Sequence, residues 1–242
     1  MGAALVTVVI PTYNEAQNLE RAVSSVRAAL PAADLLIVDD DSPDGTGELA
    51  DRLALADSRV AVLHRSERRG LGPAYLAAFD HLLDAPAPPG VIVEMDADGS
   101  HPADRLPALV GALDDPAVGL SIGSRWVDGG RVVDWSRSRE RISRVGNAYA
   151  RRLLGLPVRD LTAGYRAFRR EALVAAIAEP VASRGYCFQI DLARRVDDAG
   201  WSIVELPISF REREFGESKM DGRIVAEAML RVTGWGLQRL VR

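Results

Sequence analysis

The sequence is poor in several features that would each point to a particular class of protein. Its 242 residues include one cysteine, Cys187, and one lysine, Lys219. A single cysteine excludes a disulfide framework and favours a reducing compartment, so we expect Cys187 to be a small core residue. No run approaches the roughly 18 apolar residues of a membrane-spanning helix, and no secretory signal precedes the first apolar segment. No dinucleotide fingerprint or Walker A motif occurs, so dinucleotide cofactors and P-loop chemistry are not expected.

Charge is nearly balanced overall but is concentrated locally. The net charge of −4 gives no general case for nucleic-acid binding. Between residues 125 and 152, however, eight arginines stand against three acidic residues. This excess favours an anionic partner, and a solvated helix face is the structural alternative. The arginines are Arg125, Arg131, Arg137, Arg139, Arg141, Arg144, Arg151 and Arg152.

Apolar strands and helices alternate through the first half of the chain. Continuous apolar strands joined by short connections are typical of a parallel sheet with helices on both faces. Strands are predicted at 5–10, 35–38, 60–63, 91–95, 118–123 and 202–210. Helices are predicted from Asn14 and over 46–53, 70–83, 103–113, 139–154, 169–178, 188–199 and 222–241. The predicted fold class is therefore α/β: a single Rossmann-like domain with a central, mostly parallel sheet and a helical C-terminal part.

Two acidic clusters follow strands of this predicted sheet. Asp96 and Asp98 come directly after the strand at 91–95, and Asp39-Asp40-Asp41 follow the strand at 35–38. Both clusters should lie at the edge where open α/β sheets bind ligands. Two carboxylates one residue apart repel each other unless a cation neutralises them, and Mg²⁺ or Mn²⁺ with a substrate phosphate suits such a pair. The alternative for Asp96 and Asp98 is a surface turn.

A third segment, Pro11-Thr12-Tyr13-Asn14-Glu15, should lie at the same edge because it follows the first strand. Tyr13 offers a face for stacking, and Glu15 offers a hydrogen-bond acceptor. The alternative is an ordinary helix start, with Asn14 as its N-cap.

Two other functions fit parts of the acidic segments. Asp40-x-Ser42-x-Asp44-Gly45 resembles a calcium loop, although its twelfth position is Asp51 and a strand precedes it. Asp96-Ala97-Asp98-Gly99-Ser100 resembles the first motif of haloacid-dehalogenase-like phosphatases, with Asp96 as nucleophile. That motif normally lies near the start of the chain, and no convincing downstream lysine and paired-acid motif follows.

Several basic and hydroxyl side chains are candidates for binding phosphate groups of a ligand. Arg125 directly follows the strand at 118–123, and Arg139 and Ser143 are four residues apart, so on a helix they share a face that could grip a phosphate. The segment 211–219, which contains Arg213 and Lys219, is a polar loop that could close over phosphates. A plain surface connection is the alternative for that loop.

Together these residues resemble the family-2 glycosyltransferases of the A fold, and more narrowly the polyprenol- or dolichol-phosphate mannose synthases. The resemblance extends from Val6 to about Arg231. It rests on the motifs at 9–15 (VIPTYNE), 38–46 (VDDDSPDGT), 96–98 (DAD), 123–125 (GSR), 161–166 (LTAGYR) and 216–219 (GESK).

This resemblance implies GDP-mannose as donor, a polyprenyl phosphate as acceptor, and Mg²⁺ or Mn²⁺ as cofactor. Inverting transfer would give a β-mannosyl phosphate; another sugar nucleotide such as UDP-glucose is the alternative donor. Residues 1–125 would form the donor-binding half of the domain and residues 126–242 the acceptor-binding half. The implied donor-site residues are Pro11, Tyr13, Glu15, Val38, Asp40, Asp96, Ala97, Asp98, Arg125, Arg213 and Lys219. Asp98 and Ser100 would meet the metal, and Arg139 and Ser143 would hold the acceptor phosphate; Asp96, Asp98, Arg125 and Arg139 are the implied catalytic residues.

A lipid acceptor requires contact with a membrane. The arginine-rich segment 137–152, with Val145, Tyr149, Leu153 and Leu154, suits an interfacial helix. The tail, with Trp235, Leu237, Leu240 and Val241 beside Arg231, Arg239 and Arg242, suits another. We therefore expect a peripheral protein on the cytoplasmic face of a membrane, with a membrane-anchoring partner protein as an open possibility. Packing of both helices on the core is the alternative.

Overall fold

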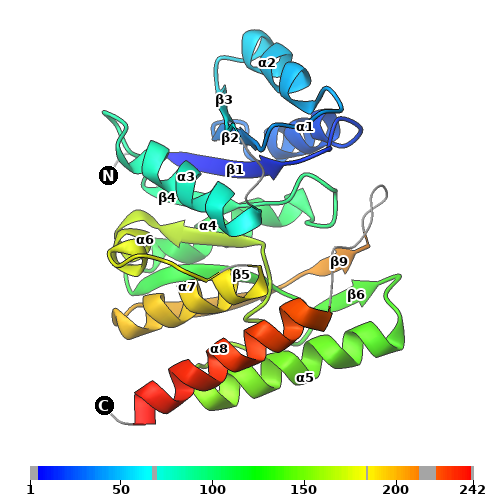
Figure 1. Cartoon of the computed structure of the whole chain (residues 1–242). Helices are drawn as coiled ribbons and strands as arrows, with labels where there is room; N and C mark the ends of the chain where they lie inside the picture. Colours follow the sequence, from blue (N-terminus) through cyan, green and yellow to red (C-terminus); the bar gives the residue numbers. More distant parts are fainter. Residues whose placement is uncertain (1–4, 67–69, 184, 213–221, 241–242) are drawn as a thin grey trace.

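A seven-stranded sheet runs through the molecule in the order β3-β2-β1-β4-β7-β5-β8 (Figure 1). The computed structural model describes residues 5–66, 70–183, 185–212 and 222–240. All strands of this sheet are parallel except β7, which runs antiparallel between β4 and β5. The strands are β1 (Val6–Thr12), β2 (Asp34–Asp39), β3 (Val60–His64), β4 (Val91–Glu94), β5 (Val118–Ser124), β7 (Arg166–Arg169) and β8 (Ser202–Pro207).

Helices cover both faces of the sheet. Buried residues of α1, α2 and α4 pack on one face, and those of α3, α5, α6, α7 and α8 pack on the other. Figure 1 shows α5 and α8 side by side at the far end of the molecule from α2. The helices are α1 (Leu19–Ala29), α2 (Thr46–Ala56), α3 (Leu71–Leu83), α4 (Leu106–Gly111), α5 (Arg137–Leu154), α6 (Arg170–Ile177), α7 (Tyr186–Asp198) and α8 (Gly222–Leu240). In the described part of the chain, no helix combines the length and apolarity that crossing a membrane requires.

The predicted α/β class with a mostly parallel sheet is confirmed, but β7 was missed. Residues 169–178 were predicted to be helical, whereas α6 begins at Arg170 and follows β7 directly. The strand is four residues long and carries arginines at both ends, so it shows no apolar run. Because β7 lies between β4 and β5, strands from before and after Arg125 belong to one sheet.

Two further boundaries differ from the prediction. The strand expected at 202–210 is divided at Pro207: β8 joins the main sheet, and β9 (Ser209–Arg211) pairs in parallel with β6 (Arg131–Val133) in a small second sheet. Proline lacks the N–H group that a continuing ladder needs. The first helix begins at Leu19 instead of following Asn14, whose φ of 59° places it in the left-handed region.

A fully buried polar cluster lies beneath the end of β4. Arg166 donates hydrogen bonds of 2.7 Å to the carbonyl oxygens of Leu161, Ala163 and Gln189. The Gln189 amide donates to the Glu94 carboxyl group over 2.8 Å. Burial raises the pKa of Glu94 to about 8 against the opposing effect of Arg166. Burial also lowers the pKa of Arg166, to about 10. The cluster ties β4, β7 and α7 together.

Glu94 should make the stability of the protein depend on pH. Its pKa in the folded state, about 8, exceeds the ordinary value of 4.5, so the folded protein retains a proton that the unfolded chain loses between these values. The free energy of unfolding should therefore fall as the pH rises through this window. Glu94→Gln removes this titration. The difference in free energy of unfolding between wild type and variant should therefore change by roughly 2–4 kcal/mol between pH 5 and pH 8. Urea unfolding at both pH values measures these free energies. If wild type and variant change equally with pH, the raised pKa of Glu94 is contradicted.

Close packing beside β5 gives a second prediction. A Cβ atom at Gly119 would lie 2.6 Å from the Cβ of Trp201 and 2.7 Å from that of Ala172. Gly119→Ala should therefore lower the free energy of unfolding by about 1–3 kcal/mol through overpacking. The control is Gly111→Ala at the end of α4, where φ is −63° and no atom lies within 4 Å. The free energy of unfolding of that variant should rise by about 0.5–1 kcal/mol. Urea unfolding measures both variants, and equal effects of the two substitutions would disprove the packing argument.

Candidate functional site

The loop that follows β4 carries Asp96 and Asp98 at the carboxyl edge of the sheet. Asp98 is almost fully buried, and its Oδ1 accepts a hydrogen bond of 3.0 Å from the backbone N–H of Ser100. Gly99 between them has a φ of +76°, and a Cβ there would meet the Arg21 guanidinium at 2.3 Å. The positive φ favours glycine at this turn, whereas the Arg21 guanidinium is the end of a flexible side chain that could move aside.

His101 braces this loop, a role that the sequence did not reveal. Its Nδ1 accepts a hydrogen bond of 3.0 Å from the backbone N–H of Asp96. Its ring stacks on Tyr165, with centroids 4.9 Å apart. Burial raises the pKa of Tyr165, and its hydroxyl donates to the carbonyl oxygen of Pro102 over 3.0 Å. The motif at 161–166 thus supports the loop from the neighbouring strand.

The hydroxyl group of Ser100 fits the predicted role as a metal ligand. Ser100 is 2% exposed, and its Oγ is a buried oxygen that has no hydrogen-bond partner among the residues that the structure describes. Among the described residues, no three His, Cys, Asp or Glu side chains gather in a metal-binding group. A cation here would therefore be held by few protein oxygens, and phosphate oxygens of a substrate would complete its shell, as is usual for Mg²⁺.

The loops that follow β1 and β2 are fastened to each other at the same edge. Backbone N–H groups of Asn14 and Glu15 donate to the hydroxyl oxygens of Ser42 and Thr46, over 3.1 and 2.9 Å. Asp39, the first residue of the predicted acidic cluster, accepts hydrogen bonds from the hydroxyl groups of Ser42 and Thr12 over 2.6 and 3.0 Å. The two segments predicted to line one nucleotide pocket are thus neighbours in space.

The predicted donor-site residues differ in accessibility. Tyr13 and Glu15 are partly exposed, whereas the side chain of Val38 is fully buried in the core. Pro11 pairs with Val38 in the parallel ladder. Asp40 is buried and its carboxylate forms an ion pair with Arg65, a partner that the sequence did not suggest.

The calcium-loop alternative is wrong. Asp51, its twelfth position, lies on α2 and binds His64 Nε2 at 2.8 Å. Asp44 accepts hydrogen bonds from the backbone and hydroxyl groups of Thr46 at the start of α2. These carboxylates serve the local structure and do not converge on one point.

Arg125, directly after β5, is almost fully buried. Its guanidinium donates two hydrogen bonds, of 2.7 and 2.6 Å, to the fully buried Asp160 and a third, of 2.9 Å, to Thr162. The ring of Trp135 lies 5.4 Å from its Cζ. Asp160, one residue before the motif at 161–166, was missed; it fixes the guanidinium predicted to bind donor phosphate.

Arg139 and Ser143 share one face of α5, as predicted. Ser136 caps this helix, and its hydroxyl accepts from the backbone N–H of Arg139 over 3.3 Å. The guanidinium of Arg139 lies 4.0 Å above the Trp135 ring and forms an ion pair with Glu212. Both Arg125 and Arg139 therefore contact Trp135. Arg213 and Lys219 lie outside the described residues, so their predicted phosphate contacts and the closing loop stay predictions.

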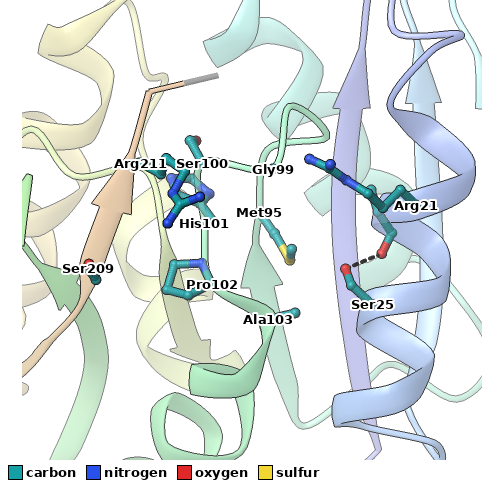
Figure 2. Close-up of a pocket in the computed structure, with 11 residues that line it drawn as sticks. Arg21, Ser25, Met95, Gly99, Ser100, His101, Pro102, Ala103, Ser209 and Arg211 are labelled. Atoms are coloured by element: carbon teal, nitrogen blue, oxygen red, sulfur yellow. Dashed lines mark hydrogen bonds between the residues drawn. The ribbon is translucent and has the colours of Figure 1, made fainter. Parts of the chain in front are cut away.

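A pocket of about 400 Å³ opens beside the loop that follows β4 (Figure 2). Arg21 reaches from α1 toward Gly99, and Ser209 and Arg211 of β9 form the opposite wall. The remaining lining residues are Ala22, Ser25, Met95, Ser100, His101, Pro102 and Ala103. Ser100 thus lies in the wall of an open cavity, although its own surface is almost fully covered.

The helices predicted to lie at a membrane are partly packed on the core. Of the four apolar residues named on α5, Val145 is 68% exposed, whereas Tyr149, Leu153 and Leu154 pack inward. On α8, Trp235 packs against the core and Arg239 pairs with Asp197 and Asp198 of α7, but Leu237 is 59% exposed. Arg231 and Leu237 are described, while Val241, Arg242 and the side chain of Leu240 lie outside the described part.

Comparison with known proteins identifies the family. A family model described as glycosyl transferase family 2 matches residues 7–175. The chain is 53% identical over 232 residues to polyprenol monophosphomannose synthase of Mycolicibacterium smegmatis, covering 96% of this chain and 86% of that protein. It is 50% identical over 232 residues to undecaprenyl-phosphate mannosyltransferase of Micrococcus luteus, and the match covers 96% of this chain and 94% of that protein.

Solved structures share the fold at lower identity. Glucosyl-3-phosphoglycerate synthase from Mycobacterium tuberculosis, in complex with Mn²⁺, UDP-glucose and glycerol 3-phosphate, gives a TM-score of 0.69 at 24% identity over 96% of this chain and 81% of that one. A mannosyltransferase from Pyrobaculum calidifontis, in complex with GDP-mannose and Mn²⁺, gives a TM-score of 0.63 at 22% identity. The match covers 99% of this chain and 64% of that chain. The family model and the two half-identical relatives overturn the phosphatase alternative for Asp96. With the A-type architecture, the family model and two half-identical relatives in agreement, the chain belongs to glycosyl transferase family 2.

Proposed function

We propose that this chain transfers mannose from GDP-mannose to a polyprenyl phosphate and releases GDP. The observation that carries the proposal is the identity of 53% and 50%, along 96% of the chain, with a polyprenol monophosphomannose synthase and an undecaprenyl-phosphate mannosyltransferase. The residues at the edge of the sheet support it. Acidic and aromatic side chains follow β1, β2 and β4, and arginines follow β5 and start α5.

The donor binds, in this proposal, across the loops after β1, β2 and β4. Tyr13 and Glu15 lie partly exposed beside the Asp40 loop, where a ring and carboxylates suit a nucleoside. Asp98 and Ser100 hold the divalent cation, and Asp96 and Ala97 lie on the donor side of the same loop. When bound, the cation neutralises negative charge on the diphosphate of the leaving GDP.

The reaction needs positioning and charge neutralisation more than a general base. A phosphate monoester is already anionic, so its oxygen attacks the anomeric carbon as the bond from that carbon to the GDP oxygen breaks. Arg139 and Ser143 hold this phosphate on one face of α5. Arg125, held by Asp160, contributes positive charge on the side of the diphosphate; the same role is predicted for Arg213 and Lys219, which lie outside the described residues. A direct displacement of this kind inverts the α-linked donor and gives a β-mannosyl phosphate.

Access to a lipid acceptor is proposed at the α5 and α8 end of the molecule. Ile142 and Val145 are exposed on α5 among its arginines, and Met229, Leu230 and Leu237 are exposed on α8. Apolar residues with surrounding arginines suit the interface of an anionic membrane. We place the protein peripherally on the cytoplasmic face, with or without an anchoring partner.

Transfer of label tests the proposed activity. GDP-[¹⁴C]mannose, polyprenyl phosphate in detergent and Mg²⁺ or Mn²⁺ should yield label in the organic phase, and UDP-[¹⁴C]glucose should yield little. Asp98→Asn should lower the rate at least about a hundredfold because a ligand of the neutralising cation is lost. Asp128→Asn, at an exposed acid that pairs with Arg159 across 3.5 Å, is the matched control and should retain activity. No lipid-bound mannose with wild-type protein would refute the proposed reaction.

Binding of the metal tests Ser100 without reference to turnover. Ser100→Ala should weaken Mn²⁺ binding in the presence of GDP at least about tenfold, as judged by electron paramagnetic resonance of free Mn²⁺. Thermal stability should hardly change, since the Ser100 hydroxyl has no protein partner. The control is Ser25→Ala on the opposite wall of the pocket. Equal Mn²⁺ affinity of both variants would remove Ser100 from the metal site.

A further inference from the structure

Arg139, the proposed ligand of the acceptor phosphate, already binds a carboxylate of its own chain. Its Nη1 donates a hydrogen bond to Glu212 Oε1, and the two side chains are 20% and 31% exposed. A half-buried pair is screened less by solvent than a surface pair. An acceptor phosphate that binds Arg139 must therefore compete with Glu212.

The backbone holds the two partners in place. Glu212 directly follows β9, and its N–H donates to the carbonyl oxygen of Val133 in β6 over 3.3 Å. In the ladder of the small sheet, Val133 is the partner of Arg211. Trp135 and the cap of α5 follow β6 within three residues. The carboxylate is thus tethered close to Arg139 and competes at a high effective concentration.

Glu212 leaves donor groups around Arg139 unused. Within the described part of the chain, Arg139 Nε and the indole Nε1 atoms of Trp135 and Trp126 are buried N–H groups without a hydrogen-bond partner. The Trp126 and Trp135 rings lie 6.4 Å apart, and Arg139 stacks on Trp135. Arg139 also lies in the first turn of an 18-residue helix, where the helix dipole favours an anion. Buried donors without acceptors are unfavourable, so this environment suits an anion with more oxygens or more charge than one carboxylate.

We propose that Glu212 determines acceptor specificity as a tethered competitor for Arg139. The inference rests on the proposed function, in which Arg139 binds the acceptor phosphate. A phosphate monoester carries close to two negative charges and three terminal oxygens, so it displaces the single carboxylate. A diester, an alcohol or a carboxylate has less charge or fewer free oxygens and displaces it poorly.

The same competition assists release of the product. Transfer converts the monoester into a mannosyl phosphodiester, which has one negative charge and two free oxygens. The carboxylate of Glu212 therefore competes better with the product than with the substrate. Glu212 returns to Arg139 once the new bond between phosphate oxygen and anomeric carbon has formed.

Glu212→Gln tests the inference because it keeps the shape of the side chain and removes its charge. The KM for polyprenyl phosphate should fall about tenfold, while the KM for GDP-mannose stays unchanged. The mannosyl phosphodiester, added as an inhibitor, should bind at least about tenfold more tightly to the variant. Binding of a short, water-soluble prenyl phosphate, measured by calorimetry without donor, should strengthen by the same factor as the KM falls.

The matched control is Glu140→Gln. Glu140 lies in the same first turn of α5 and pairs with Arg144, away from Arg139, so both KM values should remain those of the wild type. An acceptor KM that is unchanged or raised in Glu212→Gln would overturn the inference, and a raised value would make Glu212 a support of Arg139 instead. These outcomes are read only against a wild type that transfers mannose; a wild type that transfers none refutes the proposed function itself.

Discussion

The buried guanidinium of Arg166 is the interaction on which the arrangement of the site depends. Its three hydrogen bonds of 2.7 Å fix the carbonyl groups of Leu161 and Ala163 in one loop and of Gln189 in α7. The fixed loop presents Asp160 to Arg125 and Tyr165 to His101. A charged group pays a large desolvation penalty in the core, so Arg166 remains there only because its neighbours supply acceptors from every side.

Arg166 also links the two parts of the mixed sheet. It begins β7, the antiparallel strand inserted between β4 and β5, and pairs in register with Glu94 of β4. Glu94 and Arg166 are both fully buried, with Glu94 two residues before Asp96. β4, which leads into the loop with Asp96 and Asp98, is thus joined through β7 to the segment 160–166, where Asp160 binds Arg125. One buried cluster therefore positions both the acidic loop after β4 and the arginine after β5 that the proposed reaction uses.

Several charged groups assigned to ligands are paired within the protein. Asp40 pairs with Arg65, Arg125 with Asp160, and Arg139 with Glu212. These pairs differ in exposure and so in what a ligand can displace. The Arg125–Asp160 pair is buried with three hydrogen bonds and acts as part of the framework. The side chains of Arg139 and Glu212 are 20% and 31% exposed, so a phosphate can reach this pair.

The fold class, the family and the edge of the sheet proposed to bind ligands could be predicted from the sequence, because apolar periodicity, motifs and polar residues at strand ends are local signals. The sequence did not reveal β7, whose arginines hide the strand, or the partners Asp160, His101 and Glu212. Glu212 lies 73 residues from Arg139, and only the pairing of β6 with β9 brings them together. Tertiary structure decided which charges face each other, since ion pairs between distant segments depend on strand order and register, which no local pattern encodes.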